Sequence, residues 1–376
     1  MWKLPDTIGQ RFPLVARPRP ACLPLPQRVK GLVELAETAE KLDDPSMAST
    51  VYNQAALIAS DVGTPDIART MCHQHAAAYL HATPLSGETA IRALEPVVNL
   101  ARLRLRAGEG DDGRQCLLAL FDAVSTGASS QIEEIVVPAG LTATTEDRHE
   151  VRSWLWRILL ADGTRALTTA GRWAEALAHV KEHRGVGQRM FDGRQVAVLA
   201  ALAAGNALDA GNLLAVTEPA ESWESAVTGC LTALCRRVAG GSWRRYLQDL
   251  VAAYLEHPDE DGMTVFETRL GLAMLDVIAS PEEPAARLVV ADLHRRTNKA
   301  TDGYAARETL AHPLVARLST DREMRDCRAL LHACALGTGT LPNDLRSQLA
   351  DALRTSAHVI RQSVADLERA CAAERT

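Results

Sequence analysis

Aromatic residues are scarce in this 376-residue chain: they make up 4% of it, although hydrophobic residues as a whole make up 47%. The apolar content therefore rests on Ala and Leu, which favour helices, rather than on Val, Ile and Tyr, which favour strands. This balance argues against a large sheet and predicts an all-α fold. A chain of this length forms either two or three ordinary domains or one extended array of helices.

Positive charge is also in short supply. The chain carries 41 Lys and Arg against 47 Asp and Glu, which gives a formal net charge of −6. A protein that contacts many phosphate groups needs a basic excess, so the composition argues against nucleic acid as a direct partner. Only five of the basic residues are Lys. This preference for Arg, together with the abundance of Ala, is typical of a GC-rich bacterial genome.

The sequence pattern contains no paired cysteines, and it predicts neither a secretory signal nor a membrane span. The eight Cys stand singly, without a CxxC pair, so we expect reduced core residues in a cytoplasmic protein. The most apolar stretch, residues 196–216, contains Asn206, Asp209 and Asn212, and it predicts a helical hairpin rather than a membrane span. Near the N-terminus, prolines interrupt every apolar run: Pro5, Pro13, Pro18, Pro20, Pro24 and Pro26.

What the sequence does contain divides it into four segments. Residues 1–28 predict an extended, Pro-rich arm. Residues 29–126 carry nearly continuous helical signals and predict N-terminal helical repeats. Residues 127–145 include the β-branched run "QIEEIVV" followed by Pro and Gly, which predicts a non-helical insertion, a short hairpin, at a domain boundary. Residues 146–376 predict a C-terminal array of helix pairs.

A repeat of 34 residues lies inside that array. Ala170, Gly171, Glu175 and Ala176 recur as Ala204, Gly205, Asp209 and Ala210, and a weaker echo follows at Ala239-Gly240. This period matches the tetratricopeptide repeat, in which two helices cross closely at small residues. We therefore expect Gly171 and Ala176 to allow a close crossing, and stacked pairs to form a right-handed α-solenoid with a concave face.

The segment "AGRWAEALAHV", residues 170–180, resembles the start of the second helix of a tetratricopeptide repeat. The other helix pairs lack the full Trp, Tyr and Pro pattern of that family. Most of the chain is also similar to uncharacterised helical-repeat proteins of high-GC bacteria, through the segments "YNQAALIASDVGTPDIARTMC", "LLADGTRALTTAGRW", "FDGRQ" and "DGYAARETLAH". The resemblance implies an accessory or regulatory role in the cytoplasm, with no cofactor and no assigned reaction.

Catalytic and metal-binding motifs are weak. His179, Glu182 and His183 satisfy the HxxEH pattern of a zinc hydrolase, in which two imidazoles one turn apart hold the metal and the acid activates water. The alternative is an ordinary helix edge, because no third ligand stands out. The "CHQH" segment at Cys72 lacks a second ligand pair at finger spacing, and "GEGDDG" at Gly108 has the wrong charge for a phosphate loop.

Polar residues that interrupt apolar helical runs are the candidate binding residues. Because the first helix of each pair lines the concave face of such arrays, arginines there are placed to clamp carboxylates or a peptide backbone. The alternative is that these side chains cap helices or form surface ion pairs. The candidates are Asn53, Asn99, Arg157, Arg165, Arg189, Asp192, Arg194, Gln195, Tyr304 and Arg307.

Tryptophans are spaced about one to a helix, as core residues would be, although a Trp on a concave wall also serves as a binding anchor. Five of the six Trp lie in the predicted C-terminal array of residues 146–376: Trp154, Trp156, Trp173, Trp223 and Trp243.

The sequence thus predicts a non-catalytic scaffold or regulator that binds a protein or peptide, with a homodimer also left open. Two alternatives remain: a sensor of a small molecule or peptide that acts on a separate effector, and an accessory or zinc-dependent hydrolase of a biosynthetic pathway.

Overall fold

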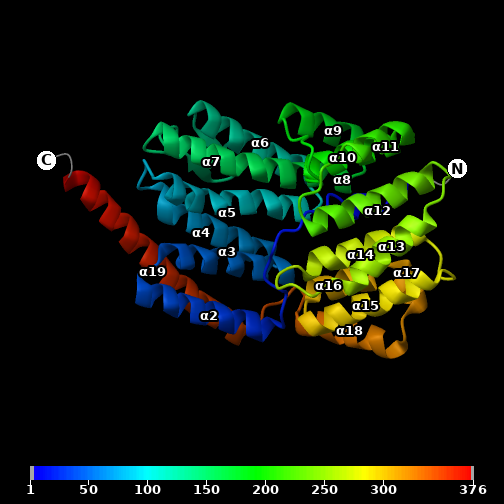
Figure 1. Cartoon of the computed structure of the whole chain (residues 1–376). Coiled ribbons are helices and arrows are strands. Elements are labelled where there is room, and N and C mark those ends of the chain that lie inside the picture. Colours follow the sequence, from blue (N-terminus) through cyan, green and yellow to red (C-terminus); the bar gives the residue numbers. More distant parts are fainter. Residues whose placement is uncertain (1–3, 374–376) are drawn as a thin grey trace. The chain divides into compact units, whose positions relative to one another are not determined.

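The computed structural model describes residues 4–373 (Figure 1). The chain folds into two compact units, each built from two separate stretches of sequence. Unit 1 contains the described residues up to Pro24 together with Thr164–Cys334. Unit 2 contains Leu25–Gly163 and the described residues from Ala335 onward. Each unit has its own hydrophobic core, and the described part of the chain is predominantly helical, as the composition predicted.

Unit 2 is a run of helices in which each packs against the next. Its helices are α2 (Leu25–Leu42), α3 (Pro45–Val62), α4 (Pro65–Leu80), α5 (Gly87–Arg106), α6 (Gly110–Thr126) and α7 (Thr145–Ile158). Local sequence sets the ends: the Asp44 carboxylate accepts from the backbone of Ser46 and Met47 at the start of α3, and Gly63 ends that helix with a φ of 93°. The C-terminal helix α19 (Asn343–Ala373) packs on α2 and α3 (Figure 1).

The segment between α6 and α7 forms an antiparallel hairpin of β1 (Ser130–Ile132) and β2 (Ile135–Val137). Glu133 lies in the turn of this hairpin. Its carboxylate accepts hydrogen bonds from His73 Nε2 at 3.0 Å and from Arg104 Nη2 at 3.2 Å, and it also forms an ion pair with Arg69. Burial by itself would raise the pKa of the Glu133 carboxyl, but hydrogen bonds from His73 and Arg69 outweigh it and leave the pKa lowered. This ion-pair cluster fastens the hairpin to α4 and α5.

Unit 1 contains shorter and less regular helices. They are α8 (Thr164–Thr169), α9 (Trp173–Glu182), α10 (Asp192–Ala203), α11 (Ala207–Ala215), α12 (Ser222–Val238), α13 (Arg244–Glu256), α14 (Thr264–Ile278), α15 (Pro284–Ala300), α16 (Gly303–Leu310), α17 (Pro313–Leu318) and α18 (Asp321–Ala333). Its core is built mainly from α10, α12, α13, α14 and α15.

The N-terminal segment, residues 4–24, is part of the unit 1 fold. It forms a short helix, α1 (Ile8–Arg11), and buries Ile8, Phe12 and Leu14 completely or nearly so. This differs from the predicted arm over residues 1–28, because α2 already begins at Leu25 and the apolar side chains between the prolines find a core to enter. Residues 1–3 of that prediction, and residues 374–376 of the predicted C-terminal array, lie outside the described residues.

The division between the units also differs from the boundary predicted at residues 127–145. The hairpin belongs to unit 2, and the chain passes into unit 1 after Gly163, at the end of a five-residue π-helical segment, η1 (Leu159–Gly163). The sequence change at the hairpin is local, because the Glu133 cluster holds it against helices that precede it. A change of secondary structure is therefore no mark of a domain boundary here.

The Ala-Gly repeat marks helix ends rather than close helix crossings. After α8, the Gly171 N–H and the Arg172 N–H bond back to the last turn, the latter to Leu167 O at 3.0 Å. The same pair of bonds recurs at Gly205 and Gly240, and all three glycines have φ between 70° and 78°. A Cβ on any of the three would meet nothing within 4 Å. Glycine is required by the left-handed backbone, and the expected crossing role of Gly171 is not observed.

Among residues 4–373, no helix is both long enough and apolar enough to cross a membrane.

Candidate functional site

Two of the predicted binding residues hold the N-terminal segment of the same chain. The Gln195 side chain is fully buried; its Oε1 accepts from Leu14 N and its Nε2 donates to Leu14 O, both at 2.6 Å. Asp192 Oδ2 pairs with Arg17 at 2.6 Å. A side-chain amide that bonds both backbone groups of one residue holds an extended peptide, and the peptide here is residues 12–17 of this chain.

The three predicted arginines of unit 1 bond separate partners rather than lining one shared strip. Arg189 bonds Glu221 at 2.7 Å and the buried Glu224 at 2.9 Å. Arg194 is buried and donates to Val216 O at 3.1 Å, whereas Arg165 donates to Gln10 O at 3.5 Å. Arg157 is exposed on α7, in unit 2, while the other three belong to unit 1.

Asn53 and Asn99 lie in a hydrogen-bonded chain within unit 2. The Asn53 amide donates to Glu95 Oε2 at 2.6 Å, and the Asn99 amide donates to Asn53 Oδ1 at 3.0 Å. Arg102 then bridges Asn99 Oδ1, at 3.2 Å, and Asp162 Oδ2, at 2.7 Å. Burial raises the pKa of Glu95, although the Asn53 bond opposes that rise. These hydrogen bonds connect α3, α5 and η1, so the two Asn side chains link helices within unit 2.

Tyr304 and Arg307 lie together on α16. Tyr304 is half-buried, and its backbone N–H is capped by Asp302 at 2.8 Å. The exposed Arg307 guanidinium lies 5.5 Å from the centre of the Tyr304 ring.

The HxxEH residues are arranged as a helix edge. The His179 and His183 rings meet edge to face at 4.8 Å between centroids, with His179 buried and Glu182 exposed. Among residues 4–373, no group of three or more His, Cys, Asp or Glu side chains is placed to hold a metal ion. In the "CHQH" segment His73 bonds the hairpin, and His75 is buried against Tyr52 with ring centroids 4.9 Å apart.

A Cys–His–Ser arrangement in unit 1 has hydrogen-bonding geometry but no access. Cys327 Sγ lies 3.3 Å from His294 Nδ1, and His294 Nε2 lies 2.7 Å from Ser319 Oγ. Cys327 and His294 are buried, and burial raises the pKa of the Cys327 thiol to about 11 and lowers that of His294. A neutral thiol sealed from solvent is a poor nucleophile, so this arrangement is structural.

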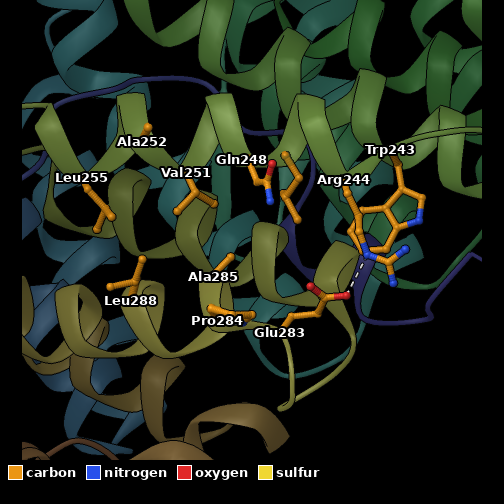
Figure 2. Close-up of a pocket in the computed structure, with 11 residues that line it drawn as sticks. Trp243, Arg244, Gln248, Val251, Ala252, Leu255, Glu283, Pro284, Ala285 and Leu288 are labelled. Carbon is orange, nitrogen blue, oxygen red and sulfur yellow. Dashed lines mark hydrogen bonds and ion pairs between the residues drawn. The ribbon is translucent and has the colours of Figure 1, made fainter.

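A groove between α13 and α15 presents an apolar surface to solvent (Figure 2). Its volume is about 290 Å³. One wall is the α13 stripe, in which residues recur every four positions and so share one helix face: Trp243, the residue before α13, with Leu247, Val251 and Leu255. Leu247 and Val251 are buried in the core of unit 1, and Trp243 and Leu255 are partly exposed. The other wall is the start of α15, with Pro284, Ala285 and Leu288, and Leu288 is 54% exposed.

A charged pair lies at one end of this groove. Arg244 Nε bonds Glu283 Oε1 at 2.8 Å, linking the first residue of α13 to the residue before α15. Figure 2 shows this pair beside Trp243, with Leu255 and Leu288 at the opposite end. Polar groups at one end and apolar groups along the rest are the ordinary composition of a binding groove.

Trp243 is held by two arginines. The Arg237 and Arg244 guanidinium carbons lie 4.5 Å and 5.0 Å from the centre of its ring. Arg237 also donates to the carbonyls of Val277 and Ile278, the latter at 2.8 Å, and so caps the end of α14. Burial and the neighbouring Arg244 lower the pKa of Arg237. The indole is therefore fixed by packing and cation–π contacts at the edge of the groove.

Comparisons with protein-family models, curated proteins and solved structures found no match.

The groove was only partly visible in the sequence. Trp243 was a candidate anchor, and residues 242–255 were predicted to be helical, yet the four-residue stripe gives no sign of whether its face is covered. The opposite wall comes from residues 284–288, across the intervening helix α14. Only the packing of α13 on α15 buries the middle of the stripe, Leu247 and Val251, and leaves its two ends partly exposed.

Proposed function

We propose that the protein is a non-catalytic scaffold or regulator that binds a peptide or protein partner in the α13–α15 groove. The observation that carries the proposal is the exposed apolar lining. Leu288 remains 54% exposed beside Ala252 and Leu255, and burial of such surface by a partner is favourable by about 25 cal/mol per Å². The ionisable residues of the lining are Arg244 and Glu283, which bond each other, so the groove suits contact rather than proton transfer.

The proposal includes a tetratricopeptide-like arrangement of helix pairs within the units and a cytoplasmic location. The three turns at Gly171, Gly205 and Gly240 support the first part. Each turn ends one helix and leads into the next helix, and the three turns have the same backbone hydrogen bonds and a similar positive φ. The cysteines support the second. Cys22, Cys72, Cys116, Cys230, Cys235, Cys327 and Cys334 are all free thiols, and the side chain of Cys371 lies outside the described part.

Panning a displayed peptide library against the purified chain tests the proposal. Leu288→Glu places a charge in the groove, and Leu208→Glu makes the same change on α11, where Leu208 is 75% exposed and lies outside the groove. We expect enriched peptides that bind the wild-type chain and Leu208→Glu alike and lose at least about tenfold in affinity for Leu288→Glu, which corresponds to about 1.4 kcal/mol. Equal binding to all three proteins would refute the groove as the binding site.

A further inference from the structure

The end of the groove at Trp243 is positively charged, although the chain as a whole is negative. Two arginines end α12 and two begin α13: Arg236, Arg237, Arg244 and Arg245. The acidic residues near this end are Glu282 and Glu283, at the start of α15, and Asp249, one turn along α13 from Arg245. Glu283 bonds Arg244, and Glu282 accepts from Ser280. Positive charge is therefore in excess at this end, against a net charge of −6 for the chain.

Part of that positive charge is available to a ligand. Arg236 lies 4.0 Å from the centre of the Tyr246 ring, and Tyr246 is 42% exposed. No carboxylate within residues 4–373 forms an ion pair with Arg236 or Arg245, both of which are exposed. The first turns of α13 and α15, which start at this end, contain no acidic residue, so their partial positive charges add to the same field.

The rest of the groove has the form of a seat for one helix. The α13 stripe from Trp243 to Leu255 is about 18 Å long at 1.5 Å per residue, which matches about 12 residues of a second α-helix. Leu247 and Val251, in its middle, are buried and form the floor of the groove. The apolar side chains open to solvent are Ala252 and Leu288, together with the partly exposed ends of the stripe. Ala252 and Gln248 lie beside the stripe, and Leu288 forms the facing ridge. An apolar helix face repeats at positions i, i+3, i+4 and i+7 and fits such a groove without leaving backbone groups unpaired.

We infer that the occupant of the groove is an amphipathic helix of a partner protein whose acidic residues lie at the end of the helix that meets Arg236, Arg244 and Arg245. The inference rests on the proposed function and names the partner class for the same groove. The apolar face of that helix covers Leu288, Ala252 and the partly exposed ends of the α13 stripe, and its carboxylates face the arginines. A nucleic acid would use the arginines and Tyr246 but leave Leu288 and Ala252 uncovered, so the helix satisfies more of the surface.

Synthetic probes of about 14 residues test this inference. Each is a fluorescein-labelled, hydrocarbon-stapled helix with Leu at i, i+3, i+4 and i+7, because an unconstrained helix of this length is marginal in water. Three otherwise identical probes end in a block of three Glu, three Gln or three Lys, and the block is placed at either end of the helix in turn. For one placement we expect the Glu probe to bind about tenfold tighter than the Gln probe, with the Lys probe weakest, and the difference to shrink in high salt.

Paired variants locate the charge effect. Arg236→Glu with Arg245→Glu is expected to reverse the preference, so that the Lys probe binds best. The matched control is Arg322→Glu with Arg325→Glu, which makes the same change in net charge on exposed arginines of α18 and should leave the preference unchanged. Equal binding of the three probes, together with sensitivity to Leu288→Glu, would overturn the acidic helix while the groove function stands; insensitivity to Leu288→Glu would overturn both.

Two further outcomes contradict the inference. The first is a dimer, seen by sedimentation equilibrium of the chain alone, that Leu288→Glu dissociates. This result would mean that a second copy of the chain occupies the groove. A labelled single-stranded oligonucleotide that binds the wild-type chain more tightly than the Glu probe, and is lost with Arg236→Glu and Arg245→Glu, makes nucleic acid the ligand.

Discussion

Unit 1 buries charged residues, whereas unit 2 buries an almost entirely apolar core. The buried Asp, Glu and Arg of the described chain all belong to unit 1: Arg11, Asp192, Arg194, Glu224, Glu267, Asp276, Asp292, Arg296 and Asp302. In the described part of unit 2 the buried polar residues are Ser49, His75, Thr89 and Ser356. Unit 2 stacks long consecutive helices, and hydrophobic contacts between neighbouring helices are sufficient to fix their positions. Unit 1 must fix short helices and the N-terminal segment, and directional ion pairs do this at sites where apolar packing does not specify one arrangement.

Two clusters of buried ion pairs show how unit 1 fixes its short segments. Asp276 on α14 accepts from Thr7 and Arg11 of the N-terminal segment, at 2.8 Å and 3.0 Å, and lies 3.3 Å from His312. Burial by itself would raise the pKa of Asp276, but the bonds from His312 and the charge of Arg11 leave it lowered. Arg296 on α15 forms the second cluster and is bonded at every guanidinium nitrogen to groups of other segments or of its own helix.

The largest expected effect comes from removing Arg296. Arg296→Met leaves the buried Asp292 and Glu267 without their shared cation, and a buried pair that loses one partner costs about 3–5 kcal/mol of unfolding free energy. Urea unfolding followed by circular dichroism measures the loss. The control is Arg354→Met on α19, whose ion pair with Asp351 is exposed and worth less than about 1 kcal/mol. Similar losses in the two variants would contradict the contrast between the units.

A second prediction concerns the fit of the N-terminal segment. A Cβ at Gly9 would lie 2.3 Å from Thr168 O, so Gly9→Ala forces the segment away from α8 at a cost of up to about 3 kcal/mol. Limited proteolysis should then cut within residues 4–24 at a lower protease concentration. Gly31→Ala is the matched control on α2, since a Cβ there meets nothing within 4 Å. Unchanged cleavage in Gly9→Ala would show that the segment is not held as described.

The third prediction uses the buried histidine of unit 2. Burial lowers the pKa of His75 to about 3, and neither of its ring nitrogens has a hydrogen-bond partner among residues 4–373. The unfolded chain therefore takes up a proton below about pH 6.5 that the folded chain refuses, and stability is lost as the pH falls toward 3.

The contribution of His75 is on the order of 2 kcal/mol between pH 7 and pH 5. His75→Phe keeps a ring beside Tyr52 and removes the titration. Urea unfolding of both proteins over this pH range should show a steeper decline in the wild type. Parallel declines in stability would rule out a neutral, buried His75.

The smallest effect is expected at the helix ends. Gly171→Ala forces a φ of 70° on a residue with a side chain and should cost about 1–2 kcal/mol. Gly211→Ala, in the interior of α11 with open space around the Cβ, should instead stabilise by about 0.5–1 kcal/mol. Thermal unfolding compares the two. Shifts of the same sign would mean that close packing, rather than backbone conformation, selects glycine at the repeated Ala-Gly positions.

Helix positions were the most predictable feature, because they follow from nearest-neighbour sequence. The Gly63 stop and the Thr64-Pro65 start lie where the structure ends α3 and begins α4. The short α17 was not predicted, since six residues give too little periodicity. Candidate binding residues were less predictable. An Arg or Asn inside an apolar run shows that a polar partner is needed, yet the partners of Arg189 and Gln195 lie 35 and 181 residues away.

The sequence by itself determined the helical composition, the helix ends and the hairpin, because backbone conformation at these positions depends on propensity, caps and glycine. The tertiary structure alone decided that the N-terminal segment completes unit 1, that α19 packs on α2 and α3, and that a groove remains open between α13 and α15. These outcomes depend on which apolar faces and buried charges meet across long sequence separations. Local sequence does not encode that choice, because many helix faces have similar apolar patterns and differ only in the partner that covers them.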